Sequence, residues 1–344
     1  IHARLFFTTP NGKDIEIFCL DPSEPRDYQQ SFSATDTVRW KCLVGGNRKW
    51  KSGPATLEVP IDGRKVTLTA ERLNRLDKAF EIAFSWSDNS LSFGEILDAA
   101  GQIPLPPYLG RSAEASDLES YQTVFARTEG SVAAPTAGLH ISEVLMERLK
   151  QQNFNWSEVI LHVGAGTFRP VSSPTIGGHE MHAEYFEVDR SFLERLYAQL
   201  NSNQPIVSVG TTSTRCLESL YYLGSLFSLG EWNFPNNGLA EVKQWVASEY
   251  KHRCTAQQAI YALLEAMQLA NRTYLTGSTQ LIITPGIQPK IIDGLITNFH
   301  QPNSTLLLIV AAITGEDWRK IYAHALAEDY RFLSYGDGSL LWKS

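Results

Sequence analysis

The segment IVSVGTTSTRCLESLYYL, residues 206–223, decides the fold class of the larger part of the chain. Residues 206–209 are rich in β-branched side chains and predict a buried strand, whereas residues 214–223 have the apolar content of a helix. Gly210 and a run of Thr and Ser join the two, which is the composition of a turn that opens a helix. A strand that passes through a short turn into a helix is the repeating unit of an α/β domain.

Similar strand and helix patterns follow one another on both sides of this segment. Strands are predicted at 158–163, 280–284 and 291–297, and helices at 191–200, 255–271, 305–313 and 318–327. Because strands that alternate with helices usually join through crossovers, we expect an α/β domain with a mostly parallel sheet.

The first part of the chain has a different pattern, in which short predicted strands follow one another. Short strands are predicted at 3–7, 15–20, 38–44, 56–59, 65–69 and 79–86, with a hairpin turn at Asn11-Gly12. Strands of this length and spacing predict a small all-β barrel or sandwich. Ser92 and Glu95 match a helix capping box, which marks the change of character. We expect one domain at 1–90 and an α/β catalytic domain at 91–344, with a helical insertion at about 231–272.

Composition places the chain among globular proteins of a reducing compartment. Hydrophobic residues make up 43% and charged residues 19% of the 344 residues. The longest apolar run, 306–313, has eight residues, far fewer than the roughly 20 that span a bilayer. The four cysteines are scattered without a CxxC pair, which favours free thiols over disulfides or a zinc ribbon. We therefore expect a cytoplasmic protein without a membrane segment.

The net charge of -7 argues against nucleic-acid binding by the whole surface. Residues 37–65 are an exception, with seven Lys and Arg against two acidic residues, and with Trp40 and Trp50 among them. This stretch fits a phosphate-contacting patch with stacking aromatics, centred on Arg48, Lys49 and Lys51. Solvent-exposed strand faces, with the two Trp side chains buried, would explain the composition of residues 37–65 equally well.

Six segments concentrate Gly, His, Thr and Arg where predicted strands meet loops: 130–140, 161–170, 179–184, 209–218, 296–305 and 330–338. In open α/β sheets, ligands bind beyond the carboxyl ends of strands, where such junctions lie. The turn after residue 209 offers hydroxyls and backbone N–H groups to an anion. Gly164 and Gly166 permit close approach of a ligand to the backbone.

A metal site is the competing interpretation of one of these segments. His179, His182 and Glu184 lie close together, but the HExxH spacing and a third ligand are absent from the sequence. We expect no metal, and a metallohydrolase built on His179 and His182 remains the alternative that metal analysis would test.

The segments GSVAAPTAGLH (130–140), HVGAGTFRPV (162–171), VGTTSTRCLE (209–218), LITNFHQPNSTLLLIV (295–310) and YRFLSYGD (330–337) resemble those of the S-adenosylmethionine:tRNA ribosyltransferase-isomerase family of queuosine biosynthesis. The resemblance implies a β-barrel domain inserted in an α/β domain, and the strand and helix pattern gives an α/β domain with a mostly parallel sheet plus a smaller all-β barrel domain. It also implies S-adenosylmethionine as a consumed substrate, and tRNA carrying 7-aminomethyl-7-deazaguanine as the acceptor. Epoxyqueuosine-tRNA, adenine and methionine are the implied products, and no metal is implied.

The implied reaction needs a base, an acid and groups that hold the substrate. Histidine suits the proton transfers because its pKa lies near operating pH, and the expected catalytic residues are His140, His182 and His300. The expected substrate-binding residues are Thr136, Gly164, Gly166, Thr167, Arg169, Thr211, Thr212, Arg215, Asn298 and Asp337. Thr211, Thr212 and Arg215 are the candidates for an anionic group, and Asp337 for a ribose hydroxyl or an exocyclic amine.

Some positions depart from the family pattern. Ile141 and Gln301 follow the two motif histidines where other residues are usual, and the stretch 231–272 is long. The alternative function is therefore a divergent tRNA-binding or S-adenosylmethionine-binding paralogue without this activity.

Overall fold

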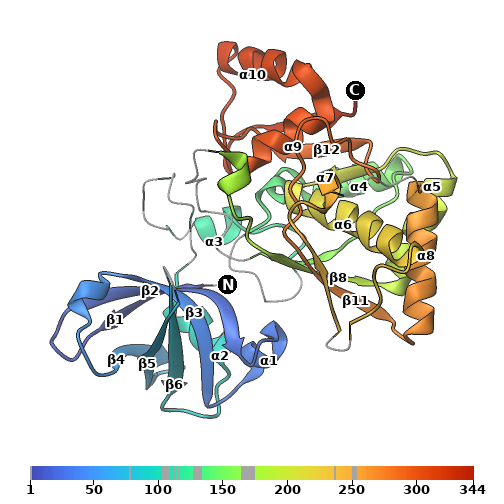
Figure 1. The fold of residues 1–344 in the computed structure, drawn as a ribbon. Helices are drawn as coiled ribbons and strands as arrows, with labels where there is room; N and C mark the ends of the chain where they lie inside the picture. The colour runs from blue at the N-terminus through green and yellow to red at the C-terminus, as the bar shows by residue number, and fades with distance from the viewer. Residues whose placement is uncertain are drawn as a thin grey trace. The chain divides into compact units, whose positions relative to one another are not determined.

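The structure is a computed structural model that describes residues 2–76, 79–102, 105, 109, 111, 114, 116–126, 134–163, 175–235, 238–249 and 254–344. These residues form two compact units (Figure 1). The barrel unit contains the described residues up to 122. The larger unit contains residues 123–125, 135–162 and the described residues from 175 onward. The predicted domain border at residue 90 stays a prediction.

The barrel unit is built on a closed antiparallel barrel in the order β1-β2-β3-β6-β5-β4. Its strands are β1 (Arg4–Thr8), β2 (Asp14–Glu24), β3 (Thr37–Gly45), β4 (Ala55–Ile61), β5 (Arg64–Leu76) and β6 (Ala79–Trp86). Its helices are α1 (Tyr28–Ser33), η1 (Asn47–Lys49), α2 (Phe93–Ala100) and α3 (Asp117–Ser120). Pairing of Thr8 with Thr56 closes the ring, so the barrel expected for the first part of the chain is present.

Alternation of side chains explains the barrel core. Leu5 and Phe7 of β1 point inward while their neighbours face solvent, as the two-residue period of a strand requires. Helix α2 adds Phe93 to this core. Its capping box is present, because Ser92 accepts from the backbone N–H of Glu95 and the Glu95 carboxylate accepts from that of Ser92.

The larger unit contains two small sheets. Its strands are β7 (Ile160–His162), β8 (Glu184–Asp189), β9 (Val207–Val209), β10 (Leu239–Val242), β11 (Tyr274–Thr279), β12 (Gly294–Asn298) and β13 (Gly338–Trp342). Its helices are η3 (Thr136–His140), α4 (Glu143–Gln151), η5 (Ile176–Gly178), α5 (Arg190–Asn201), α6 (Thr211–Ser228), α7 (Val246–Glu249), α8 (Ala256–Leu269), α9 (Thr305–Thr314), η6 (Gly315–Asp317) and α10 (Trp318–Ala327). One sheet has the order β10-β11-β8-β7 and the other β13-β12-β9.

The expectation of a mostly parallel sheet is wrong. Among the described strands of the larger unit, β10–β11 and β9–β12 pair in parallel, whereas β11–β8, β7–β8 and β12–β13 pair antiparallel. Both sheets are therefore mixed. Hydrophobic periodicity predicts that a segment is a strand, but strand direction depends on which distant segment it pairs with.

Several element bounds also differ from the prediction. Residues 280–284 are not a strand, because the ladder of β11 ends at Thr279, although the backbone N–H groups of Gln280 and Ile282 still donate to the carbonyls of Val242 and Gln244. Strands β8, β11 and β13 had not been predicted. The stretch 231–272 is not wholly helical, because β10 lies within it before α7 and α8.

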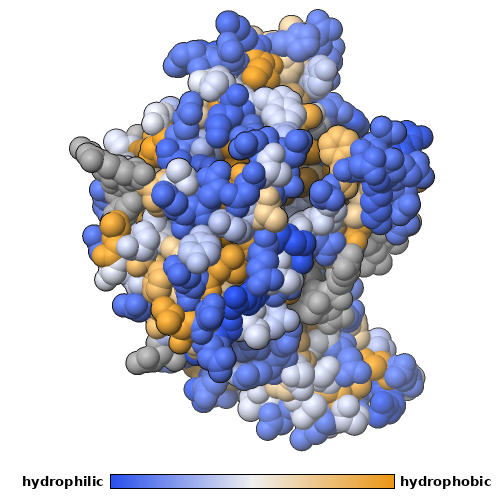
Figure 2. Space-filling model, turned by 90° about the vertical axis from the view of Figure 1, so that its right-hand side faces the viewer, coloured by the Kyte–Doolittle hydropathy of each residue, from blue (hydrophilic) through white to orange (hydrophobic). Residues whose placement is uncertain are grey.

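Helix α6 is the central helix of the larger unit. All its residues from Thr214 to Ser225 are buried, and it packs against α8 and the sheet strands. On the face drawn in Figure 2, hydrophilic residues predominate and hydrophobic ones are interspersed among them. Among the helices described, none is long and apolar enough to cross a bilayer.

Candidate functional site

One end of the sheet β13-β12-β9 gathers residues from four separate parts of the chain. The parallel strands β9 and β12 end at Val209 and Asn298, and β13 begins at Gly338, which pairs with Asn298. The carboxyl ends of parallel strands are where ligands usually bind in sheets with crossover helices. Three of the six motif segments thus meet at one edge.

The 3₁₀ helix η3 brings a fourth segment to this edge. Nε2 of His140 lies 2.5 Å from Oδ1 of Asn298, and Nδ2 of Asn298 donates to Oγ1 of Thr136 at 2.8 Å. Asn298 is buried, whereas His140 and Thr136 are half-buried. An amide oxygen only accepts hydrogen bonds, so Nε2 of His140 carries the proton. In the neutral ring the lone pair is then on Nδ1.

Gly338 is in close contact with this histidine. A Cβ added at Gly338 would lie 3.0 Å from Cδ2 of the His140 ring, so a side chain there would require a small shift of the imidazole. The preceding residue, Asp337, accepts from the backbone N–H of Arg331 at 2.7 Å and from its guanidinium at 2.9 Å. These hydrogen bonds, with a smaller contribution from His140, lower the pKa of the Asp337 carboxyl. Asp337 is therefore an ionised acceptor at neutral pH.

The turn before α6 lies at the same edge. Gly210 has a φ of 93°, a conformation that strains any residue with a side chain, and its N–H donates to the carbonyl of Ile296 at 2.8 Å. A Cβ added there would lie 3.6 Å from that of Ala137 in η3. Thr211 and Thr212 follow in the first helical turn and are half-buried.

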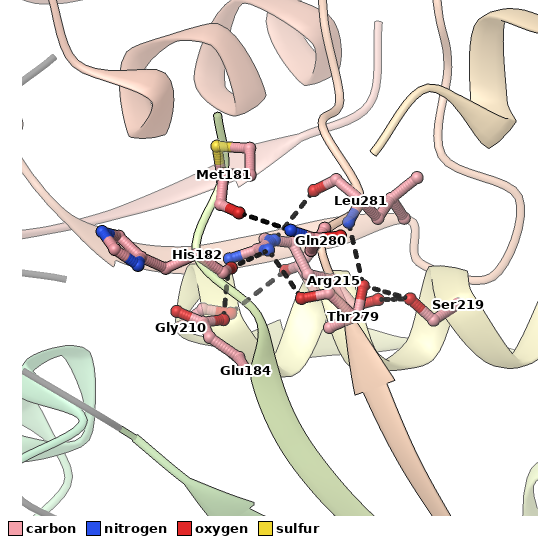
Figure 3. Close-up of polar contacts among 10 residues, drawn as sticks. Met181, His182, Glu184, Gly210, Arg215, Ser219, Thr279, Gln280 and Leu281 are labelled. Carbon is pink, nitrogen blue, oxygen red and sulfur yellow. Dashed lines mark hydrogen bonds and ion pairs between the residues drawn. The ribbon is translucent and has the colours of Figure 1, made fainter. Parts of the chain in front are cut away.

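Arg215, by contrast, is engaged inside the protein (Figure 3). Its side chain is 5% exposed, and Nη1 lies 2.8 Å from Oε2 of the buried Glu184. Nε donates to the carbonyl of Leu281 at 2.9 Å, and Nη2 to that of Thr279 at 3.1 Å. The guanidinium thus ties α6 to β8, to the end of β11 and to the segment that follows it, and its contact with a substrate anion stays a prediction.

The other two expected catalytic histidines, His182 and His300, lie in different surroundings. The imidazole of His182 is exposed and points away from Arg215, whose guanidinium contacts the His182 carbonyl (Figure 3). His300 is buried, and Nε2 of its ring lies 2.9 Å from Oγ1 of Thr297. The backbone N–H of His300 donates to the Tyr322 hydroxyl. Burial lowers the pKa of His300 to about 4, so its ring is neutral at physiological pH.

Two positioning carboxylates were not anticipated in these roles. Glu184 had been considered as a metal ligand and instead pairs with Arg215. Glu218 is buried in α6 and accepts from the backbone N–H groups of Lys290, Ile291 and Ile292, which lead into β12. For Glu218, the available signal was a charged residue on an otherwise apolar helix.

Four expected substrate-binding residues, Gly164, Gly166, Thr167 and Arg169, lie outside the described residues. Within the described part of the chain, no group of three or more His, Cys, Asp or Glu side chains is placed to hold a metal ion.

The basic stretch of the barrel unit divides into paired and solvent-facing residues. Arg39, Arg64 and Lys65 form ion pairs with nearby carboxylates. Arg48 and Lys49 in η1 and Lys51 just after it are exposed. Trp40 and Trp50, 0% and 2% exposed, belong to the barrel core and are not accessible for stacking on a base.

Comparison with known proteins identifies the family. A model of the family described as "Queuosine biosynthesis protein" matches residues 1–341. S-adenosylmethionine:tRNA ribosyltransferase-isomerases of Sorangium cellulosum and Staphylococcus saprophyticus are 36% and 38% identical over 99% and 98% of this chain, and over 81% of their own length. A solved S-adenosylmethionine tRNA ribosyltransferase from Thermotoga maritima is 24% identical over 99% of this chain and 78% of its own, with a TM-score of 0.38. By the family match and these identities, the chain belongs to the queuosine biosynthesis protein family.

Proposed function

We propose that this protein is an S-adenosylmethionine:tRNA ribosyltransferase-isomerase. It transfers and isomerises the ribosyl moiety of S-adenosylmethionine onto 7-aminomethyl-7-deazaguanine in tRNA, and it releases adenine and methionine. Identity of 33–38% to curated enzymes of that name, over nearly the whole chain, carries this conclusion. Its four cysteines are free, which supports a reducing, cytoplasmic location.

The reaction begins with loss of a proton from the carbon beside the sulfonium, and His140 is the proposed base. Asn298 holds Nε2 in its protonated form, so Nδ1 is the atom that accepts the proton. Thr136 fixes the orientation of the Asn298 amide and thereby the tautomer. The three side chains act as one unit, and among these three only His140 moves a proton.

The anionic end of the substrate is assigned to the first turn of α6. The unpaired N–H groups and the positive end of the helix dipole favour a carboxylate or phosphate near Thr211 and Thr212. Arg215 supports this turn from inside through Glu184. Asp337, kept ionised by Arg331, is proposed to accept a hydrogen bond from a ribose hydroxyl or an exocyclic amine.

The remaining histidines are given separate roles. His182 is exposed and is proposed as the acid that assists departure of adenine. His300 is neutral and bonded to Thr297, the residue before Asn298, and is proposed to position Asn298. For tRNA, the exposed Arg48, Lys49 and Lys51 are the proposed contacts with phosphates.

The test is an assay of adenine release from S-adenosylmethionine in the presence of tRNA that carries 7-aminomethyl-7-deazaguanine. We expect adenine and methionine in equal amounts, only when the modified tRNA is present, and unchanged by a chelator. Binding of both substrates without adenine release would favour the divergent paralogue instead.

A further inference from the structure

The barrel unit has a cavity that the proposed chemistry does not use. It has a volume of about 380 Å³ and is lined by Asn47, Arg72, Leu73, Asn74, Arg75 and Phe80. A second cavity of about 100 Å³ is lined by Trp50, Ser52, Gly53, Glu71 and again Arg72. Arg72 is thus the side chain that the two cavities share.

The guanidinium of Arg72 is held by two aromatic rings. Its Cζ lies 5.4 Å from the ring centroid of Trp50 and 5.5 Å from that of Phe80. Trp50 is itself fixed, because it is 2% exposed and its indole N–H donates to the carbonyl of Gly53 at 2.8 Å. Such contacts orient the planar group in advance and leave its N–H edge to a ligand.

A β-bulge brings a second arginine to the same cavity. In a regular strand, residues three apart point to opposite faces of the sheet. The pairing of β5 with β6 shifts register between Arg72 and Arg75, however, and both side chains line the larger cavity. Bulges often re-aim side chains next to functional sites.

The charge of the cavity favours an anion. Among the described residues, its lining includes two arginines and two asparagines but no carboxylate. The nearby Glu81 accepts a hydrogen bond from Nδ2 of Asn74 at 2.7 Å. Among the described residues, the ion pairs of the barrel strands involve Arg4, Arg39, Arg64 and Lys65 and do not include Arg72.

We propose that this cavity binds a phosphodiester group of the tRNA backbone, with Arg72 as the two-pronged donor and Arg75 as a second positive charge. A guanidinium presents parallel N–H groups that match two phosphate oxygens. The apolar Phe80 and Leu73 give the adjoining sugar a wall to contact. The proposal rests on the proposed function, which makes tRNA a substrate.

The experiment measures tRNA binding to the full chain by fluorescence anisotropy over a range of salt concentrations. Arg72→Ala should weaken binding about tenfold and flatten the slope of log affinity against log salt by nearly one, the value expected for one lost phosphate contact. Arg72→Lys keeps the positive charge but loses the parallel N–H groups of the guanidinium. The affinity for tRNA should therefore fall while its salt slope stays the same. Asn47→Asp, which leaves the Arg72 side chain intact, should also weaken binding by adding a negative charge to the lining.

Arg26→Ala is the matched control, because Arg26 is an exposed arginine of the same unit that lines neither cavity. Equal losses for the Arg26 and Arg72 variants, or unchanged binding by Arg72→Ala and Asn47→Asp, would overturn the proposal. Binding of inorganic phosphate that depends on Arg72, with unaltered tRNA affinity, would assign the cavity to a free anion and also overturn it. If the wild-type protein binds no tRNA and releases no adenine, the proposed function fails as well. Failure of the cavity proposal alone is distinguishable, because the wild-type protein then still binds tRNA and releases adenine.

Discussion

Nε2 of His140 and Oδ1 of Asn298 lie 2.5 Å apart, although 158 residues separate them in the chain. The contact joins η3 to the end of β12 and selects the tautomer of the imidazole. It places the available lone pair on Nδ1, because the amide oxygen cannot donate. The catalytic assignment of His140 depends on this relationship.

Replacing His140 with Gln should reduce the rate of adenine release by about 10²–10⁴-fold, the usual contribution of a general base. Binding of S-adenosylmethionine should change little, since Gln retains a similar size. His324→Gln is the control, because His324 is an exposed histidine on α10. A fully active His140→Gln enzyme would remove His140 from the proton transfer.

Asn298→Asp should shift the pH profile of the reaction. A carboxylate in place of the amide beside the imidazole stabilises the protonated, charged ring relative to the neutral ring. Because the base must be unprotonated, the rising limb of the pH–rate profile should move to higher pH by about one unit. An unmoved profile, with a rate reduced equally at every pH, would indicate a structural role only.

Arg215→Met should destabilise the larger unit by about 3–5 kcal/mol, because it leaves the Glu184 carboxylate buried without its partner. The measurement is the free energy of unfolding in denaturant. Arg190→Met, which breaks the partly exposed pair with Glu194, is the control and should cost less than about 1 kcal/mol. Similar costs for the two variants would contradict the assigned role of Arg215.

His300 should make stability depend on acid pH. Its pKa is about 4 in the folded chain and about 6.5 when unfolded, so the unfolded state binds the proton more tightly. The contribution of His300 to the free energy of unfolding is complete above pH 6.5. It is lost as pH falls from 6.5 to 4, by about 3 kcal/mol in all. The difference in unfolding free energy between the wild type and His300→Gln should follow this window. Parallel pH curves would show that burial does not perturb His300.

The barrel surface should contribute phosphate contacts to tRNA binding. Replacing Arg48, Lys49 and Lys51 together with Ala should weaken tRNA binding, and it should flatten the salt slope by up to about three. Binding of S-adenosylmethionine should hardly change, since the proposed site for it is in the larger unit. Unaltered tRNA affinity and salt dependence would mean that these side chains only solvate the surface.

Local signals in the sequence were sufficient for individual elements. Ser92 and Glu95 specify the start of α2 because both capping bonds form within four residues. Gly12, with a φ of 69°, lies in the turn between β1 and β2 where the Asn11-Gly12 pair predicted it. The motif segments likewise indicated His140, Asn298 and the turn before α6, because family motifs are local stretches of sequence.

The direction of the strands and the use of the charged side chains depended on tertiary structure. Strand β11 runs antiparallel to β8, a pairing between segments that are about 90 residues apart and that no local periodicity encodes. Arg215 follows a helix start that suggested an anion site, yet its partners are Glu184 and the carbonyls of His182, Thr279 and Leu281. Residues close together in the sequence thus determined the barrel strands, the long helices and the motif segments, whereas β8, β11 and β13 of the larger unit were not recognised from local patterns. Only the packing of distant segments decided sheet topology and which charges are neutralised inside, because both depend on contacts that the chain makes after it folds.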